Sequence, residues 1–447
     1  MFGRKINFWT TRHCTAYTFA VLVGIIIGVL SGFCAWVLKL MIGSLTELIM
    51  SGFNRDGANW WLLLLPVTGI VLTVFYQHFI LKRNIQHGVE KVQEDIKDNR
   101  FRFGAKMIFA PMIASTLTLG FGGSAGSEGP IATTSASIGS WVGNFFGMSR
   151  AQLRLMIGIG AGAGIAGIFK APIGGALFTI EVLMLEISTL STITLIIGCI
   201  ASSLTAYTLS GFTYDINVTS YIFFDTSILP WVFVLGILCG FYSIYYSAIM
   251  RTLRKFYEGR RNIWVRAALS GGLLSICVFL FPILYGEGYG LLTRMLDGTK
   301  EIVAEASPFH SFTGKPELLM LIMAGVVAVK PVACVSTNSG GGVAGDFAPT
   351  LFAGGLFGFL FAFALNDLLN LDLTTAGFAY IGMAGVMAGA VRAPLMAIFL
   401  TAEMCDGYQF FLPLTIAATI SFCIVHIAAS RTGRTAKDTT GTYRSAK

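Results

Sequence analysis

The chain has 447 residues, of which 55% are hydrophobic and 12% are charged, and its formal net charge is +8. Soluble proteins carry about 25% charged residues, so this composition excludes an ordinary soluble domain and indicates a polytopic α-helical membrane protein. The positive charge does not indicate nucleic-acid binding, because the basic residues flank apolar segments, as the positive-inside rule expects. The five histidines lack metal-ligand spacing and the eight cysteines form no CxxC pair, so we expect no metal or haem and free cysteines that pack in apolar segments.

The apolar segments follow one another along the chain as candidate membrane helices. Several are shorter than the span of about 20 residues that a bilayer requires, and many are interrupted by Gly or Pro. Broken helices persist in a membrane only where protein buries them or where they line an aqueous cavity, so this pattern predicts a channel or transporter core. We expect apolar helices over residues 17–42, 60–81, 109–119, 131–146, 153–169, 173–186, 192–209, 228–250, 267–284, 318–329, 351–365, 378–390, 393–404 and 411–429, and a short helix in the polar segment near 89–96.

Basic residues at both ends of the chain predict its orientation. Arg4, Lys5 and Arg12 precede the first apolar segment, and five basic residues end the chain. We therefore expect a multi-pass protein of the cell membrane with both termini in the cytoplasm. The basic segment 251–261 is expected to be a cytoplasmic loop, and 285–312 a long loop. The first apolar segment lacks a small-residue cleavage site, so we do not interpret it as a removable signal peptide.

The glycine-rich segment 122–130 consists mainly of backbone and one carboxylate. Pro130 favours a helix start, so we expect a helix from Ile131 with Glu128 just ahead of it. Glycines let the backbone approach a ligand closely, and the free N–H groups and dipole of a helix start bind anions. The segment therefore predicts an anion site in which the Glu128 carboxylate can take the place of the anion. The alternative is a tightly packed turn with a surface glutamate as helix cap.

Two motifs of the first half recur in the second. Residues 167–173 (GIFKAPI) resemble 389–395 (GAVRAPL) at an offset of 222 positions, and each continues to a Thr-x-Glu at the same spacing. Residues 125–130 resemble 344–349 at an offset of 219. Two motifs at nearly one offset indicate two homologous halves.

These halves suggest a domain organisation and a way to hold an anion. If the halves are inverted, two glycine-rich helix starts meet near the membrane midplane and hold a small anion without a fixed Lys or Arg. The alternative is two fused copies whose glycines are merely structural. We expect a cytoplasmic N-terminal segment, two membrane repeats and a basic cytoplasmic tail, at residues 1–15, 16–210, 226–430 and 431–447.

With these motifs the chain resembles the CLC family of chloride channels and proton-coupled chloride transporters, over nearly the whole membrane core. The family's Gly-(Arg/Lys)-Glu-Gly-Pro is similar to residues 126–130, its Gly-x-Phe-x-Pro to 345–349 and its Gly-Ser-Gly-Ile-Pro, in degraded form, to 86–90. The run 403–409 also resembles the family. The resemblance implies an all-α membrane fold, an inverted repeat of broken, tilted helices, and a homodimer with one pore per subunit. It is to the prokaryotic type, because the tail is too short for C-terminal nucleotide-binding CBS domains.

The resemblance also implies roles for single residues. Glu128 is the expected gating carboxylate, which competes with the anion when it is ionised and swings away when it is protonated. The backbone amides of Asp346 and Phe347 are expected to bind the central anion, and those of Ser127, Glu128 and Gly129 to line the outer site. Chloride or a similar small anion is the expected substrate, protons are a further possible partner, and no cofactor is expected.

Three positions near this site depart from the family pattern. Ser127 replaces the usual Arg or Lys, which makes the field near the gate less positive. His87 replaces a serine that contacts the anion; its ring N–H either donates to the anion or caps a helix that faces cytoplasmic water. Asp346 would place an acid beside the anion, so we expect its side chain to turn away, towards a basic group such as Lys330, and leave its amide for the anion.

The residues that would handle protons also differ. Val182 occupies the position of the transporters' internal glutamate, directly after Glu181, and valine cannot relay a proton. Glu186, one turn further on, is either a substitute or an ordinary charge at a helix end. The family's C-terminal pore tyrosine is missing at its expected spacing, where Arg434 stands, and we assign Tyr443 to the tail.

These departures favour a passive, chloride-selective channel gated by Glu128. The alternative is a chloride/proton antiporter that uses water or another acid as its relay. A fluoride exporter is less favoured, because the motif around Glu128 keeps its proline. An intramembrane protease would need a Ser/His pair or two facing aspartates; since His78, His426, Asp346 and Asp406 lack a suitable context, we expect no enzyme. A cation transporter would need acidic residues without amide-rich helix starts.

Overall fold

The structure is a computed structural model that describes residues 16–53, 57–85, 88–97, 104, 106–185, 188–213, 216, 225–297, 299–312 and 314–431. The regular structure in these residues is helical, apart from an isolated antiparallel bridge between Gly126 and Gly345. The described part of the chain has nine helical stretches that are long and apolar enough to cross a membrane, together with shorter apolar helices. The chain is therefore a multi-pass membrane protein that includes short and broken helices, as the sequence predicts.

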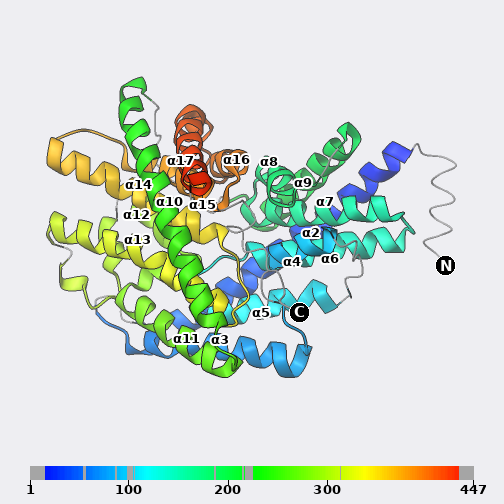
Figure 1. Cartoon of the computed structure of the whole chain (residues 1–447), viewed down its shortest axis with the longest axis horizontal. Coiled ribbons are helices and arrows are strands. Elements are labelled where there is room, and N and C mark those ends of the chain that lie inside the picture. The colour runs from blue at the N-terminus through cyan, green and yellow to red at the C-terminus, as the bar shows by residue number, and fades with distance from the viewer. Residues whose placement is uncertain are drawn as a thin grey trace.

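The first half packs around four helices, α2, α6, α7 and α9, which lie side by side on the right of Figure 1. In chain order its elements are α2 (Ala16–Met50), the 3-10 turn η1 (Trp60–Leu63), α3 (Leu65–Phe75), the π-helical turn η2 (Tyr76–Leu81), α4 (Gly88–Lys97), α5 (Lys106–Gly120), α6 (Glu128–Phe145), α7 (Arg150–Phe169), α8 (Pro172–Leu177), the π-helical turn η3 (Phe178–Val182) and α9 (Thr189–Leu209).

The second half packs around α10, α14, α15 and α17, and its α11 lies against α3 of the first half along the lower edge of Figure 1. Its elements are η4 (Thr226–Ile228), α10 (Leu229–Glu258), α11 (Ile263–Leu280), η5 (Pro282–Leu284), α12 (Tyr289–Leu296), η6 (Lys300–Ala304), η7 (His310–Phe312), α13 (Pro316–Ser339), α14 (Phe347–Leu369), α15 (Thr375–Val391), α16 (Pro394–Met404), η8 (Tyr408–Phe410) and α17 (Phe411–Arg431).

Several predicted boundaries are wrong. The expected basic loop 251–261 is mostly helix, because α10 continues to Glu258; Lys and Arg are good helix formers, and their long stems can lie along apolar surface. The expected loop 285–312 contains α12 and two 3-10 turns. α13 continues ten residues beyond 329, through Pro331, since neighbouring helices can satisfy the backbone group that a proline frees in a membrane protein.

The start of α6 also differs from the prediction. The helix begins at Glu128 rather than at Ile131, and Ser127 is its N-cap residue. Pro130 is the third residue of the first turn, where the backbone N–H would have no partner inside the helix, so the ring costs nothing there. Glu128 is therefore the first residue of the helix and not a residue ahead of it.

Glycines at corresponding positions let helices of each half approach closely. A Cβ at Gly139 of α6 would overlap the carbonyl oxygen of Met156 on α7. A Cβ at Gly358 of α14 would likewise overlap the carbonyl oxygen of Phe378 on α15. Small residues at such crossings are typical of packed membrane helices. The two helix pairs therefore repeat the same contact 219 to 222 positions apart.

The two halves exchange equivalent hydrogen bonds around the bridge. Gly126 and Gly345 pair in both directions, with N···O distances of 3.0 and 2.7 Å. Thr118 Oγ1 of the first half accepts from the Val343 N–H, and Thr337 Oγ1 of the second half accepts from the Ser124 N–H, each at 3.0 Å. Such reciprocal contacts arise when two equivalent halves are related by a two-fold axis, and they agree with the predicted inverted repeat.

The Thr-x-Glu motifs form a second reciprocal pair. Glu181 accepts hydrogen bonds from the N–H groups of Leu395 and Met396 at the start of α16, at 3.2 and 2.7 Å. Glu403 accepts from those of Ile173 and Gly174 at the start of α8, at 3.0 and 2.8 Å. Each half thus caps a helix of the other with a carboxylate, which the dipole at a helix N-terminus favours.

Candidate functional site

The side chain of Glu128 lies where the two glycine-rich segments meet, and it is 1% exposed. Its Oε1 accepts hydrogen bonds from the backbone N–H of Phe347, at 2.5 Å, and of Ala348, at 3.1 Å. Both donors belong to the first turn of α14, whose unpaired N–H groups and dipole favour a negative charge. A carboxylate of the first half therefore occupies a helix start of the second half.

The walls of this site are glycine backbone. A Cβ at either Gly126 or Gly345 would overlap the Glu128 carboxylate, so both positions require a residue without a side chain. The second carboxylate oxygen, Oε2, is buried and has no hydrogen-bond partner among the described residues. A buried acceptor of this kind is a place where a proton, a water or a donor can bind.

A buried cation lies near the carboxylate. Lys330 of α13 is fully buried, and its Nζ donates to Ser124 Oγ at 2.9 Å and lies 4.7 Å from the ring centroid of Phe352. It is within electrostatic reach of Glu128 and Glu287. A buried charge is costly unless it is compensated, and here a hydroxyl, an aromatic face and two carboxylates compensate it.

The side chain of Asp346 turns to a basic group, as predicted, but that group is not Lys330. Its carboxylate accepts from Asn338 Nδ2 at 2.5 Å and pairs with a guanidinium nitrogen of Arg254, on α10, at 3.5 Å. Lys330 donates to Ser124 instead. The predicted role of the Asp346 amide in anion binding stays a prediction.

Arg254 serves a second acid as well. Another of its guanidinium nitrogens lies 3.3 Å from Oε1 of Glu90, on the short helix α4. The pKa of Glu90 is raised to about 7, mainly because the side chain is buried; the charge of Arg254 opposes this shift and the nearby charge of Asp346 adds to it. The three side chains form an Arg254 cluster, defined as Glu90, Arg254 and Asp346, which contains more acid than base.

The two hydrogen-bond donors of Ser127 are already bound to a carboxylate. Its backbone N–H and its hydroxyl both donate to Oε1 of Glu287, at 2.8 and 2.5 Å, so a second carboxylate lies where an outer anion was expected. Gly129 lies buried in the first turn of α6, and its predicted role is untested. The predictions for His87, Glu186 and Tyr443 fall outside the described residues.

The position of the missing proton glutamate lies against α4. The carbonyl of Val182 accepts a hydrogen bond from Gln93 Nε2, on that helix, at 3.1 Å. Glu181, the neighbouring acid, is already bound to the start of α16. The structure therefore assigns Glu181 a helix-capping contact.

Sequence reasoning missed three members of the site. Ala348 donates to Glu128 beside the predicted Phe347, and its place after the phenylalanine of the motif was the available signal. Glu287 lies between two glycines, and Lys39 lies inside an apolar helix. An isolated charge in such a setting is a functional signal in membrane proteins, but it does not identify the partner.

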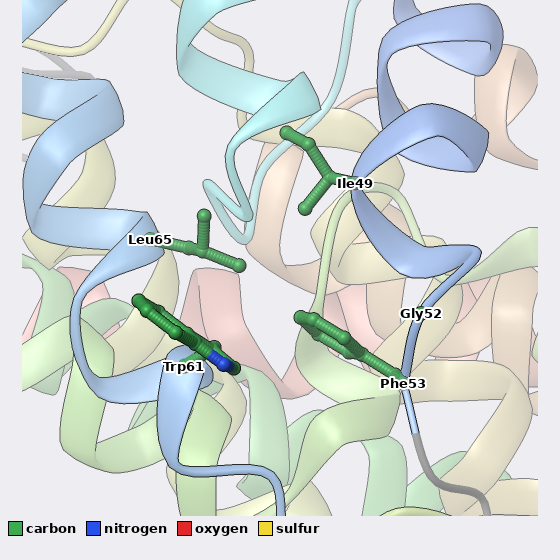
Figure 2. A pocket seen from close by; sticks show the side chains of 5 residues that line it. All are labelled: Ile49, Gly52, Phe53, Trp61 and Leu65. Carbon is green, nitrogen blue, oxygen red and sulfur yellow. The ribbon is translucent and has the colours of Figure 1, made fainter.

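An apolar pocket of about 280 Å³ lies elsewhere, between the end of α2 and the start of α3 (Figure 2). Its lining residues are Ile49, Gly52, Phe53, Trp61 and Leu65. These residues offer no ionisable side chain, so the pocket does not suit an anion. Within the described residues no group of three or more His, Cys, Asp or Glu side chains could hold a metal ion.

Comparisons with known proteins agree with this architecture. The family model for the voltage gated chloride channel matches residues 68–426. A Ralstonia nicotianae protein, described as a ClcB-like chloride channel protein, is 26% identical over 374 residues, which cover 82% of this chain and 83% of the relative. An H(+)/Cl(−) exchange transporter, ClcA, from Salmonella agona is 28% identical over 395 residues, which cover 86% and 78%.

Among solved structures, a slow cyanobacterial Cl−/H+ antiporter matches with a TM-score of 0.74 and 21% identity, over 92% of this chain and 97% of that one. At this identity the match supports the fold, and it confirms the predicted arrangement of broken helices. Because the family model covers most of the chain, the chain belongs to the voltage-gated chloride channel family, CLC.

Proposed function

We propose that this protein exchanges a small anion, chloride or a close analogue, for protons, and that Glu128 is its gate. The observation that carries the proposal is the Glu128 carboxylate bound by the backbone N–H groups of Phe347 and Ala348. A carboxylate in that position competes with an anion for the same donors, so proton binding and anion binding are coupled at one place.

Exchange has better support than the passive channel that the sequence first favoured. A relative at 28% identity is named as an exchange transporter. Val182 in place of the usual glutamate changes the route of the proton but does not exclude proton transport, because water or another acid can act as the relay. Another relative is named as a channel protein. Anion conduction without proton movement is therefore the alternative that the experiment must distinguish from exchange.

The gating step follows from hydrogen-bond strength. Hydrogen bonds from an N–H to an ionised carboxylate are about twice as strong as those to a neutral acceptor. Protonation of Glu128 therefore weakens its hold on α14, and an anion can take its place. Donors that are backbone amides rather than fixed cations hold the anion weakly enough for release, as transport requires.

The same proposal includes the predicted organisation. The anion site uses the amides of Asp346 and Phe347 centrally and those of Ser127, Glu128 and Gly129 on the outer side, and His87 is a further donor to the anion. The two repeats extend over residues 16–210 and 226–430, and both termini are cytoplasmic. The working unit is a homodimer in the cell membrane with one pore per subunit. The reciprocal caps of Glu181 and Glu403 support the division into repeats.

The test is proton movement driven by chloride. The purified protein is placed in liposomes with a chloride gradient, no pH gradient and the membrane voltage clamped by potassium and valinomycin. Exchange predicts that protons move uphill, opposite to chloride, and that Glu128→Gln keeps chloride flux but loses both proton movement and pH dependence. Chloride flux without proton movement in the wild type would make the protein a channel, and a pH-dependent Glu128→Gln flux would refute the gate.

A further inference from the structure

A second carboxylate reaches the anion path from a loop. Glu287 lies between η5 and α12, and its side chain is 13% exposed. One oxygen accepts from the N–H and hydroxyl of Ser127, and the other accepts from Lys39 Nζ at 2.9 Å. Two helix starts on the path thus each bind a carboxylate: the start of α6 binds Glu287 through Ser127, and the start of α14 binds Glu128, the residue after Ser127, through Phe347 and Ala348.

The donors around Glu287 form a complete site for a small anion. Ser127 supplies the N–H of a helix N-cap and a hydroxyl, and Lys39 supplies an ammonium group. An anion that replaced the Glu287 oxygens would find the same amide, hydroxyl and cation. Glu287 is also within electrostatic reach of Glu128, so its charge opposes any other negative charge nearby.

Glycines flank Glu287 on both sides, and the space beside Gly286 is open. Gly286 and Gly288, on either side, have φ angles of 66° and 84°, which glycine adopts without strain. A Cβ at Gly286 would meet nothing within 4 Å, whereas one at Gly288 would press against the ring of Phe352. The chain is held on both sides of Glu287, by the buried Tyr285, whose hydroxyl donates to the Gly120 carbonyl at 2.6 Å, and by the contact of Gly288 with Phe352, so movement is confined to Glu287 and its side chain. The long, flexible stem of Lys39 can follow either the carboxylate or an anion.

We propose that Glu287 is a second, movable competitor for the anion, which occupies an outer position at Ser127 and leaves it when an anion binds there, with Lys39 paired to whichever of the two is present. This inference rests on the proposed function, because it adds a second competitor to the same path. Lys39 lies about 35 Å along α2 from Ala16, at 1.5 Å per residue. Lys39 is thus closer to the Met50 end of α2, about 17 Å away at 1.5 Å per residue, than to the start of the helix, so we assign the site to the half of the membrane opposite to the start of α2.

The experiment measures the apparent KM for chloride on that side, from initial flux rates into liposomes. Glu287→Gln keeps an oxygen that can accept from Ser127 but removes the charge, so a merely structural tie would survive. We expect its apparent KM to fall by about tenfold, because charged hydrogen bonds are roughly twice as strong as neutral ones. Adding Lys39→Met to Glu287→Gln should raise the apparent KM again, because the freed ammonium would now bind the anion.

The control variant changes a loop acid outside the proposed site. Glu305→Gln breaks the pair of another loop acid with Arg294, 3.4 Å apart, and should change KM by no more than about twofold. An unchanged KM in Glu287→Gln would overturn this inference. The proposed function would still hold in that case, provided that chloride flux through Glu128→Gln no longer depends on pH. A Glu128→Gln flux that still depends on pH would refute the proposed function instead.

A second variant covers the case in which Glu287→Gln does not give a homogeneous folded protein on gel filtration. Glu287→Ala removes the competing carboxylate and leaves the N–H and hydroxyl of Ser127 and the ammonium group of Lys39 in place. The apparent KM should therefore also fall, by about tenfold, because the anion no longer competes with a charged acceptor. A KM that is unchanged or higher would overturn the inference.

Discussion

Glu128→Gln is expected to strengthen chloride binding at the start of α14. In the wild type, Oε1 accepts two backbone hydrogen bonds, from Phe347 and Ala348. The amide of glutamine keeps the shape of the side chain but competes without a charge. The empty donors are therefore available to chloride for a larger part of the time.

The size of the effect follows from the two bonds. A hydrogen bond to a charged group contributes about 1.5–3 kcal/mol and one to a neutral group about 0.5–1.5 kcal/mol. The variant thus loses about 1 kcal/mol per bond, or about 2 kcal/mol in total. Since about 1.4 kcal/mol is a factor of ten in affinity, chloride should bind about 30-fold more tightly.

Isothermal titration calorimetry with chloride measures this on purified protein in detergent at neutral pH. Glu317→Gln is the matched control, because Glu317 is exposed in the first turn of α13 and should leave the affinity unchanged. Equal chloride affinity in the wild type and Glu128→Gln would refute the argument, since the carboxylate would then not compete with the anion.

Three further predictions follow from the same contacts. Glu403→Gln and Glu181→Gln should each lower stability by about 2 kcal/mol, because each loses charge-assisted bonds to a helix start; thermal unfolding in detergent measures both. Burial raises the pKa of Glu90 to about 7 from its ordinary 4.5, so the folded protein favours its protonated form and stability should fall as pH rises between these values. Glu90→Gln should flatten that slope. Gly345→Ala should displace the Glu128 carboxylate, remove the pH dependence of flux, and add little effect when Glu128 is already alanine.

Each of these predictions has a control and a contrary result. Glu317→Gln should leave thermal unfolding unchanged. A much smaller loss of stability in one of the variants Glu181→Gln and Glu403→Gln than in the other would contradict the equivalence of the two capping contacts. Glu94, on the same helix as Glu90, is 44% exposed, so Glu94→Gln should keep the wild-type dependence of stability on pH. An unchanged pH dependence in Glu90→Gln would contradict the assignment of this dependence to Glu90. Gly272→Ala adds a Cβ in open space and should keep the pH dependence of flux.

The meeting of the two glycine-rich segments was predictable from the sequence. Residues 125–130 recur as 344–349, at nearly the same offset as the second repeated motif, 167–173 and 389–395. Two motifs at nearly the same offset indicate that both belong to one repeat of the chain. The bridge between Gly126 and Gly345 is its direct consequence. The sequence also identified the recurring Thr-x-Glu, but the capping contacts of Glu181 and Glu403 appear only when the halves are placed in space, because each partner lies more than 200 positions away.

The charges around the site could not be assigned to partners in the same way. Lys39 and Glu287 are 248 positions apart, and neither belongs to a repeated motif. Asp346 was expected to need a basic partner, but the choice of Arg254 over Lys330 depends on how α10 lies against α13 and α14. Burial cost explains why a partner exists, while its identity depends on tertiary packing.

Anomalous diffraction from bromide in crystals of Glu128→Gln tests the central claim most directly. The account predicts a bromide within hydrogen-bonding distance of the Phe347 and Ala348 N–H groups in the variant, and a carboxylate in its place in wild-type crystals grown with the same bromide concentration. Bromide bound away from these two N–H groups in the variant would contradict it.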